Sequence, residues 1–273
     1  MQHALCAVTQ PFLERSFIAD TYACIEKRGT HRAVDRYTYF ARRYRYVLKM
    51  DVKRFFPSID HEIMFGLLAR RLPEPPVQHL IRLIIDSGAS ACERVVQYLP
   101  GDTLFTPHER ARGLPIGNLT SQLWANVYLD GLDHFVCEAL RCSAYVRYMD
   151  DFVVFGDDKH GLHDVEHRVS DWLATERRLL LHETKCVVRR VDDGVTFLGY
   201  RVWPCRRRIR RGSVVRALRR VRRLSRAFAR GHVPADRVKA SLMAWLGHSK
   251  HAHTHQVERL VCSKFCLVRP HEA

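Results

Sequence analysis

Two acidic positions interrupt sequence that otherwise favours buried strands. Asp51 ends a run of β-forming residues, and the pair Asp150 and Asp151 divides an apolar stretch at residues 144–156. A single Asp at a strand end is usually a turn former, and a single Asp-Asp pair is usually a solvated loop. On neighbouring strands of one sheet, however, these positions would bring three carboxylates together.

Three clustered carboxylates concentrate negative charge that divalent cations neutralise. Ligand sets made only of oxygen suit Mg²⁺, which binds a few carboxylates together with substrate phosphates. Two such ions, about 3.5–4 Å apart, catalyse phosphoryl transfer. If Asp51, Asp150 and Asp151 converge, the sequence therefore favours a two-metal phosphoryl-transfer site.

The elements that must position these acids alternate between strands and helices. Two β-prone arms, 144–149 and 152–156, predict a hairpin with the Asp pair at its tip. The order strand, helices, hairpin, helix, strand predicts an α+β fold with an antiparallel sheet. Before the hairpin we expect a strand at 46–52, a helix capped by Asp60, a helix from Pro75, a loop-rich stretch at 86–112 and a helix at 119–140. After it we expect a helix at 165–178 and then a second hairpin, in which Asp193-Gly194 joins strand 185–191 to strand 195–202.

Positive charge is concentrated near the C-terminal end. The 273 residues carry a formal net charge of +16, and residues 201–230 contain thirteen Arg and no acid. Residues 213–229 place apolar side chains at helical spacing, with arginines on the opposite face. Such a face is either simply solvated or binds phosphates, and the absence of any acid favours phosphate. The predicted nucleic-acid contacts are Arg216, Arg219, Arg220 and Arg223.

The composition excludes several classes of protein. With 47% hydrophobic and 27% charged residues, the chain is neither intrinsically disordered nor collagen-like, and no apolar run is long enough to span a membrane. Nine scattered cysteines are typical of reduced thiols, which predicts a cytoplasmic protein. Histidines from His248 onward precede Cys262 and Cys266, but their spacing fits no standard closed zinc site.

Five blocks of sequence, in order, resemble reverse transcriptases of the bacterial, group II intron-like superfamily. The signature is Tyr148-Met149-Asp150-Asp151, and the other blocks are Lys49–Ile59, Gly113–Gln122, Leu181–Lys185 and Phe197–Tyr200. The resemblance implies a right-hand polymerase fold. Its expected parts are partial fingers at 1–44, a ferredoxin-like palm with an antiparallel sheet at 45–203, and a helical basic thumb at 204–273.

The resemblance also implies roles for individual residues. Asp51, Asp150 and Asp151 would hold two Mg²⁺ ions, with Mn²⁺ as a substitute. Phe56 matches a steric gate against ribonucleotides, although core packing explains it equally well, and Lys185 matches a lysine near the leaving pyrophosphate, although it could equally be a solvated surface lysine. The expected nucleotide-binding residues are Arg54, Phe55, Phe56, Ile116, Gly117 and Lys185, and the expected primer grip is Leu198, Gly199 and Tyr200.

The loop at residues 113–122 narrows the resemblance. Ile116 stands where most bacterial relatives have Gln, and Ser121-Gln122 stands where they have Ser-Pro. This form is similar to reverse transcriptases of diversity-generating retroelements. It implies copying of a template-repeat RNA from dNTPs onto a DNA or RNA primer, with errors at adenines and a small barrel-shaped accessory protein as partner.

Relatives carry more fingers sequence ahead of the position that matches Met1, where basic residues clasp the triphosphate. Two alternatives therefore stay open: a truncated or non-catalytic RNA-binding protein of reverse-transcriptase shape, and a retron or group II intron-type enzyme. The complete set of three aspartates favours catalysis. No membrane partner is expected.

Overall fold

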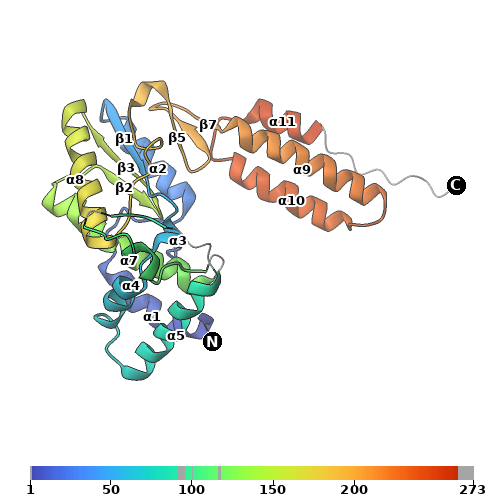
Figure 1. Cartoon of the computed structure of the whole chain (residues 1–273). Helices are drawn as coiled ribbons and strands as arrows, with labels where there is room; N and C mark the ends of the chain where they lie inside the picture. The colour runs from blue at the N-terminus through green and yellow to red at the C-terminus, as the bar shows by residue number, and fades with distance from the viewer. Residues whose placement is uncertain (1, 92–95, 100, 116–117, 264–273) are drawn as a thin grey trace. The chain divides into compact units, whose positions relative to one another are not determined.

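The computed structural model describes residues 2–91, 96–99, 101–115 and 118–263, and it divides into two compact units, Met1–Arg190 and Val191–Ala273 (Figure 1). Each unit is described by itself. The expected domain ranges 1–44, 45–203 and 204–273 stay predictions. No helix in the described part of the chain is long and apolar enough to cross a membrane.

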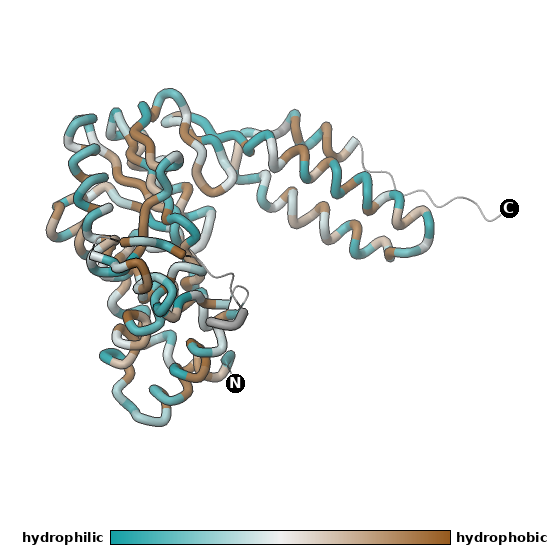
Figure 2. The backbone as a smooth tube through the Cα atoms, in the orientation of Figure 1, coloured by the Kyte–Doolittle hydropathy of each residue, from teal (hydrophilic) through white to brown (hydrophobic). Residues whose placement is uncertain are grey.

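A four-stranded antiparallel sheet forms the centre of the first unit. Its strands are β1 (Tyr46–Asp51), β2 (Tyr145–Tyr148), β3 (Asp151–Gly156) and β4 (Val187–Arg190), in the order β2-β3-β1-β4. Hydrophobic residues run along these strands (Figure 2) because both faces of the sheet are largely buried. The expected α+β class with an antiparallel sheet is confirmed.

The chain follows a ferredoxin-like order, β-α-β-β-α-β, with additional helices inserted after β1. Helix α7 (Leu119–His134) lies between β1 and β2 in the chain and continues as a π-helical turn, Phe135–Ala139; α8 (Lys159–Arg177) lies between β3 and β4. Helix α7 is buried along most of its length, and α8 packs against β1 and β3. The remaining elements of this unit are α1 (Gln2–Leu13), η1 (Glu14–Ser16), α2 (Thr30–Ala41), α3 (Phe55–Ser58), α4 (His61–Ala69), α5 (Pro75–Ala91) and α6 (Thr106–Glu109).

The outer edge of β2 is covered by the chain itself. The backbone NH of Arg147 donates to the carbonyl of Asp20 at 3.0 Å, and the NH of Tyr22 donates to the carbonyl of Arg147 at 3.0 Å. Thr21 and Arg147 form a parallel bridge between these two bonds. The segment 20–22 therefore completes the sheet next to the predicted Asp hairpin.

Several predicted elements have different ends in the structure. Helix α5 continues to Ala91, inside the stretch predicted to be loop-rich, and α8 begins at Lys159 because Asp158 accepts hydrogen bonds from the backbone of its first turn. Gly88 allows the C-terminal part of α5 to pack closely against the loop at residues 113–115. A Cβ there would meet the carbonyl oxygen of Gly113 at 2.6 Å, so only glycine lets the helix pack this closely on residues 113–115.

Asp60 is the N-cap of α4, as predicted. Its Oδ1 accepts from the backbone NH groups of Glu62 and Ile63 at 3.1 and 3.2 Å, and its Oδ2 accepts from Arg178 at 2.8 Å. We expect Asp60→Ala to lower the free energy of unfolding by about 1–2 kcal/mol, because two NH groups lose their acceptor. Urea denaturation measures this. Asp60→Asn keeps the capping oxygen and should recover most of the loss; equal destabilisation by both variants would contradict the capping role.

The second unit contains a small antiparallel sheet and three helices. The strands are β5 (Val195–Phe197), β6 (Tyr200–Val202) and β7 (Arg207–Ile209), after a short 3-10 helix η3 (Val191–Asp193). The helices are α9 (Arg211–Ala229), α10 (Ala235–Ser249) and α11 (His255–Ser263). The expected arginine-rich helix is thus present as α9, with Ala217, Val221 and Phe228 on its buried side.

The second predicted hairpin was wrong. Strand β4 pairs with β1 instead of β5, and Asp193 ends the 3-10 helix rather than a strand. The tight turn lies instead between β5 and β6 at Leu198-Gly199, where both residues have positive φ, 46° and 86°. These angles fit a two-residue hairpin turn.

Candidate active site

The register of β1 and β3 brings the three predicted aspartates together. Asp51 and Asp151 are direct Cα partners across the two strands, and the NH of Val52 donates to the carbonyl of Asp150 at 3.3 Å. Met149, which precedes them in the hairpin turn, has the left-handed φ of 59°. The expected convergence of remote acids on one sheet is therefore present.

Two lysines lie directly against these acids. Lys49 Nζ is 3.0 Å from Asp151 Oδ2, and Lys185 Nζ is 2.7 Å from Asp51 Oδ1. Lys185 reaches the site because residues 180–182 run beside the end of β1, where the NH of His182 donates to the carbonyl of Asp51 at 2.8 Å. The sequence analysis missed Lys49, although its position two residues before Asp51 on a strand places both on one face.

Burial makes the charged forms of Asp150 and Asp151 costly. Desolvation raises the pKa of Asp150, and the charge of Asp51 raises it further. Desolvation also raises the pKa of Asp151 to about 6, even though Lys49 acts to lower it. Bound cations would remove this penalty, since a nearby positive charge favours the carboxylate.

The donor set fits hard divalent cations. All three acids offer only carboxylate oxygens, and Asp151 Oδ1 is buried without a hydrogen-bond partner. Within the described ranges, no group of three or more His, Cys, Asp or Glu side chains is arranged around one common ion position. The lysines instead supply the positive charge that the acids face here.

The segment after β1 positions the next predicted residues. Arg54 is exposed in a left-handed conformation, with φ 47°, and precedes α3. Phe55 lies in the core at 3% exposure, whereas Phe56 is half-buried with its ring centroid 5.4 Å from that of Phe55. The carbonyl of Phe56 accepts from the NH of Leu114 at 3.0 Å, so the loop at 113–115 is held against it. Ile116 and Gly117 lie outside the described residues.

The predicted primer-grip and thumb residues belong to the second unit. Leu198 and Gly199 form its hairpin turn, and the buried Tyr200 has its hydroxyl 2.8 Å from His248 Nδ1 on α10. The Tyr200 ring therefore packs inside this unit. Cys266, one of the two cysteines considered for zinc, lies outside the described residues.

Helix α9 presents its arginines to solvent. Arg216, Arg219, Arg220 and Arg223 are all exposed. A hollow of about 510 Å³ is lined by Arg219 and Arg223 of this set. Its other lining residues were not among the predicted contacts: Arg222, Arg226, Ala227, Arg230 and His232. The charged surface of this unit is thus broader than predicted.

Two curated proteins are similar to this chain in sequence. Protein YkfC of Escherichia coli (strain K12) is 23% identical over 251 residues, which cover 78% of this chain and 62% of YkfC. The group II intron-encoded protein LtrA of Lactococcus lactis subsp. cremoris is 20% identical over 285 residues, which cover 82% of this chain and 45% of LtrA. The chain thus spans less than two thirds of the length of either relative.

The fold is similar to that of apo telomerase from Candida tropicalis truncated from C-terminal domain, with a TM-score of 0.55 and 15% identity over 76% of this chain and 45% of that one. A second structure of apo telomerase from the same species has a TM-score of 0.52 at 13% identity. Residues 3–202 match the reverse transcriptase (RNA-dependent DNA polymerase) family, and because this match covers most of its length, the chain belongs to that family.

Proposed function

We propose that this chain is an RNA-directed DNA polymerase that extends a DNA or RNA primer on an RNA template with dNTPs. The observation that carries the proposal is the pairing of Asp51 with Asp151 across β1 and β3, with Asp150 beside them. Family membership supports the same reaction, because residues 3–202 match the reverse transcriptase (RNA-dependent DNA polymerase) family.

In the proposed reaction, Asp51, Asp150 and Asp151 hold two Mg²⁺ ions, or Mn²⁺ as a substitute. When bound, the ions activate the primer 3′-hydroxyl and stabilise the pyrophosphate that leaves the α-phosphate. Lys185, whose Nζ is 2.7 Å from Asp51 Oδ1, would pair with that pyrophosphate or give it a proton. The arginines of α9 bind the phosphates of the template and primer.

Primer extension tests the proposal. The purified chain is given an RNA template with an annealed DNA primer, dNTPs and Mg²⁺, and extended products are resolved by length. We expect extension that stops when EDTA removes the metal. A chain that binds the duplex but never extends it would favour the alternative, a non-catalytic RNA-binding protein of reverse-transcriptase shape.

The finer proposal is that the enzyme belongs to a diversity-generating retroelement. Support comes from the form of the loop at 113–122, with Ile116 in place of Gln and with Ser121-Gln122. Such an enzyme copies a template-repeat RNA with errors at adenines and works with a small barrel-shaped accessory protein. The competing assignment is a retron or group II intron-type reverse transcriptase.

The choice between these assignments can be tested at Ile116. The resemblance implies that residue 116 contacts the incoming nucleotide. Gln there would add a group that can form hydrogen bonds, so Ile116→Gln should lower misincorporation at adenines. Sequencing of cDNA copied from one RNA template measures this. Ile116→Val is the matched aliphatic control. An error spectrum that is the same for all three proteins would contradict the retroelement assignment.

A further inference from the structure

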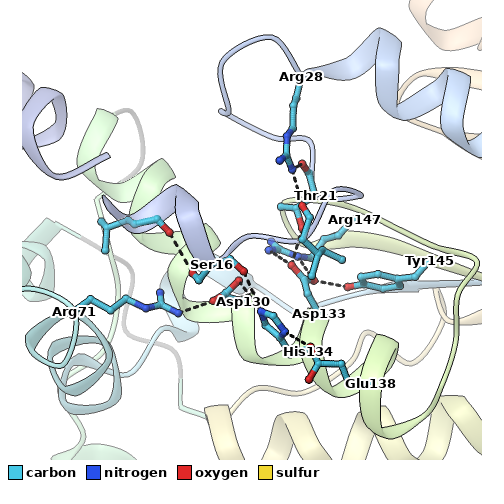
Figure 3. Close-up of polar contacts among 12 residues, drawn as sticks. Ser16, Thr21, Arg28, Arg71, Asp130, Asp133, His134, Glu138, Tyr145 and Arg147 are labelled. Atoms are coloured by element: carbon cyan, nitrogen blue, oxygen red, sulfur yellow. Dashed lines mark hydrogen bonds and ion pairs between the residues drawn. The ribbon is translucent and has the colours of Figure 1, made fainter. Parts of the chain in front are cut away.

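A fully buried charge lies next to the acidic turn. Arg147, on β2, and Asp133, on α7, both have side chains that are 0% exposed. Figure 3 shows the Arg147 guanidinium and the Tyr145 hydroxyl directed toward the Asp133 carboxylate. A buried ion pair of this kind is often no more stabilising than apolar side chains of the same volume. Its presence therefore calls for an account beyond stability.

The guanidinium divides its hydrogen bonds between two tasks. Nε and Nη2 donate to the two oxygens of Asp133, each at 2.6 Å, and this bidentate contact fixes the plane of the group. Nη1 points elsewhere: it donates to Asn126 Oδ1 at 3.1 Å and to the carbonyl oxygen of Met149 at 3.3 Å. Asp133 thus orients Arg147, and Arg147 holds the backbone of the turn.

That carbonyl belongs to a residue in an unfavourable conformation. Met149 has φ 59°, in the left-handed region that residues with a side chain rarely adopt. On the other side of the turn, the carbonyl of Asp150 accepts from the NH of Val52 on β1. The peptide that carries Asp150 is consequently fixed at both ends, by Arg147 before it and by β1 after it.

We propose that Arg147 is a positioning residue: held by Asp133, it fixes the Met149 carbonyl and so sets the direction of the Asp150 and Asp151 carboxylates. The expected effect on catalysis rests on the proposed polymerase function, whereas the effect on the conformation of the turn does not. Nothing in the resemblance assigned a role to Arg147 or Asp133.

Arg147→Lys is the informative variant. Lysine keeps a positive charge opposite Asp133, but its compact ammonium lacks the rigid planar fork with which Arg147 bonds Asp133 through Nε and Nη2 and the Met149 carbonyl through Nη1. Arg71→Lys is the matched control, since Arg71 also pairs with a buried aspartate of α7, Asp130, one turn away (Figure 3). Both variants weaken an ion pair to a buried aspartate of α7, although the Arg71 side chain is 28% exposed and that of Arg147 is 0% exposed. Only the first variant touches the acidic turn.

Hydrogen exchange is the readout that does not depend on activity. We expect peptides covering residues 148–152 to exchange at least roughly tenfold faster in Arg147→Lys than in Arg71→Lys. Peptides from the rest of the sheet should exchange at the same rate in both variants. Primer extension adds the second readout. The kcat of Arg147→Lys should fall by about 10- to 100-fold, with the KM for dNTP within about threefold of the starting protein.

The outcomes separate the two proposals. If the unaltered chain fails to extend primers, the polymerase proposal fails and hydrogen exchange alone decides the role of Arg147. Equal exchange of residues 148–152 in both lysine variants would overturn the positioning role. A kcat that falls equally in both variants would do so too, because it would then follow stability alone.

Discussion

Replacing Asp150 by Asn should reduce primer extension by roughly a thousandfold or more while the protein stays folded. The substitution removes one negative charge from the three that would hold the metal ions, and it keeps the size of the side chain. Because burial raises the pKa of Asp150, the folded protein holds this group in its charged form at a cost. The neutral amide avoids that cost, so the melting temperature should be unchanged or slightly higher.

The control for Asp150→Asn lies at the far end of the same strand. Asp157 follows β3, is exposed, and accepts only a hydrogen bond from the backbone NH of Arg45 among the contacts described. Asp157→Asn makes the same chemical change about 20 Å along the strand. Extension should be retained there. If Asp150→Asn still extends primers at the starting rate, the assignment of the three aspartates is wrong.

Phe56→Ala should allow ribonucleotides to be incorporated. A bulky ring beneath the sugar of the incoming nucleotide would clash with a 2′-hydroxyl, and alanine would remove that clash. We expect discrimination between dNTP and rNTP to fall roughly 10- to 100-fold. Single-nucleotide extension with each substrate measures the ratio. The half-buried position of Phe56, beside the fully buried Phe55, is compatible with a ring that has one free face.

Two controls separate a gate from ordinary packing. Phe56→Tyr keeps a ring of the same width and should retain discrimination. Phe55, although expected to bind nucleotide, lies in the core at 3% exposure, so Phe55→Leu should lower stability without changing the ratio of the two substrates. If Phe56→Ala loses stability but selects the sugar as before, Phe56 is a packing residue only.

The hairpin that carries Asp150 and Asp151 could be predicted because its signals are local. Apolar, β-prone arms stand on both sides of an acidic pair that no buried strand would accommodate. The N-cap at Asp60 was predictable for the same reason, since the cap acts on residues two and three positions ahead.

Long-range pairing could not be predicted from such signals. Asp193-Gly194 is a strong turn sequence, yet β4 gains more by pairing with β1, which lies far away in the chain. The actual turn includes Leu198, whose left-handed conformation no propensity favours. The resemblance picked out Phe197–Tyr200 as one of its five blocks, and the two-residue turn lies inside that block.

The sequence contains signals for Arg147 and Asp133 that the sequence analysis did not interpret. Arg147 is the one charged residue in the first arm of the hairpin, and Asp133 lies on the predicted helix 119–140 directly after Leu132. A charge in each of two buried elements indicates a partner for each. The hydrogen bond from Arg147 to the Met149 carbonyl could not be predicted from the sequence, because it depends on the fold of the turn.

The cover that residues 20–22 form over β2 also bears on how separate molecules meet. An uncovered strand can recruit the same strand from another molecule, which is a common start of fibril growth. Here the backbone of Arg147 is already bonded on that side, and at the opposite margin β4 displays Arg189 and Arg190, whose charges repel a second copy. The β2 edge of the central sheet is thereby closed to extension from one molecule into the next.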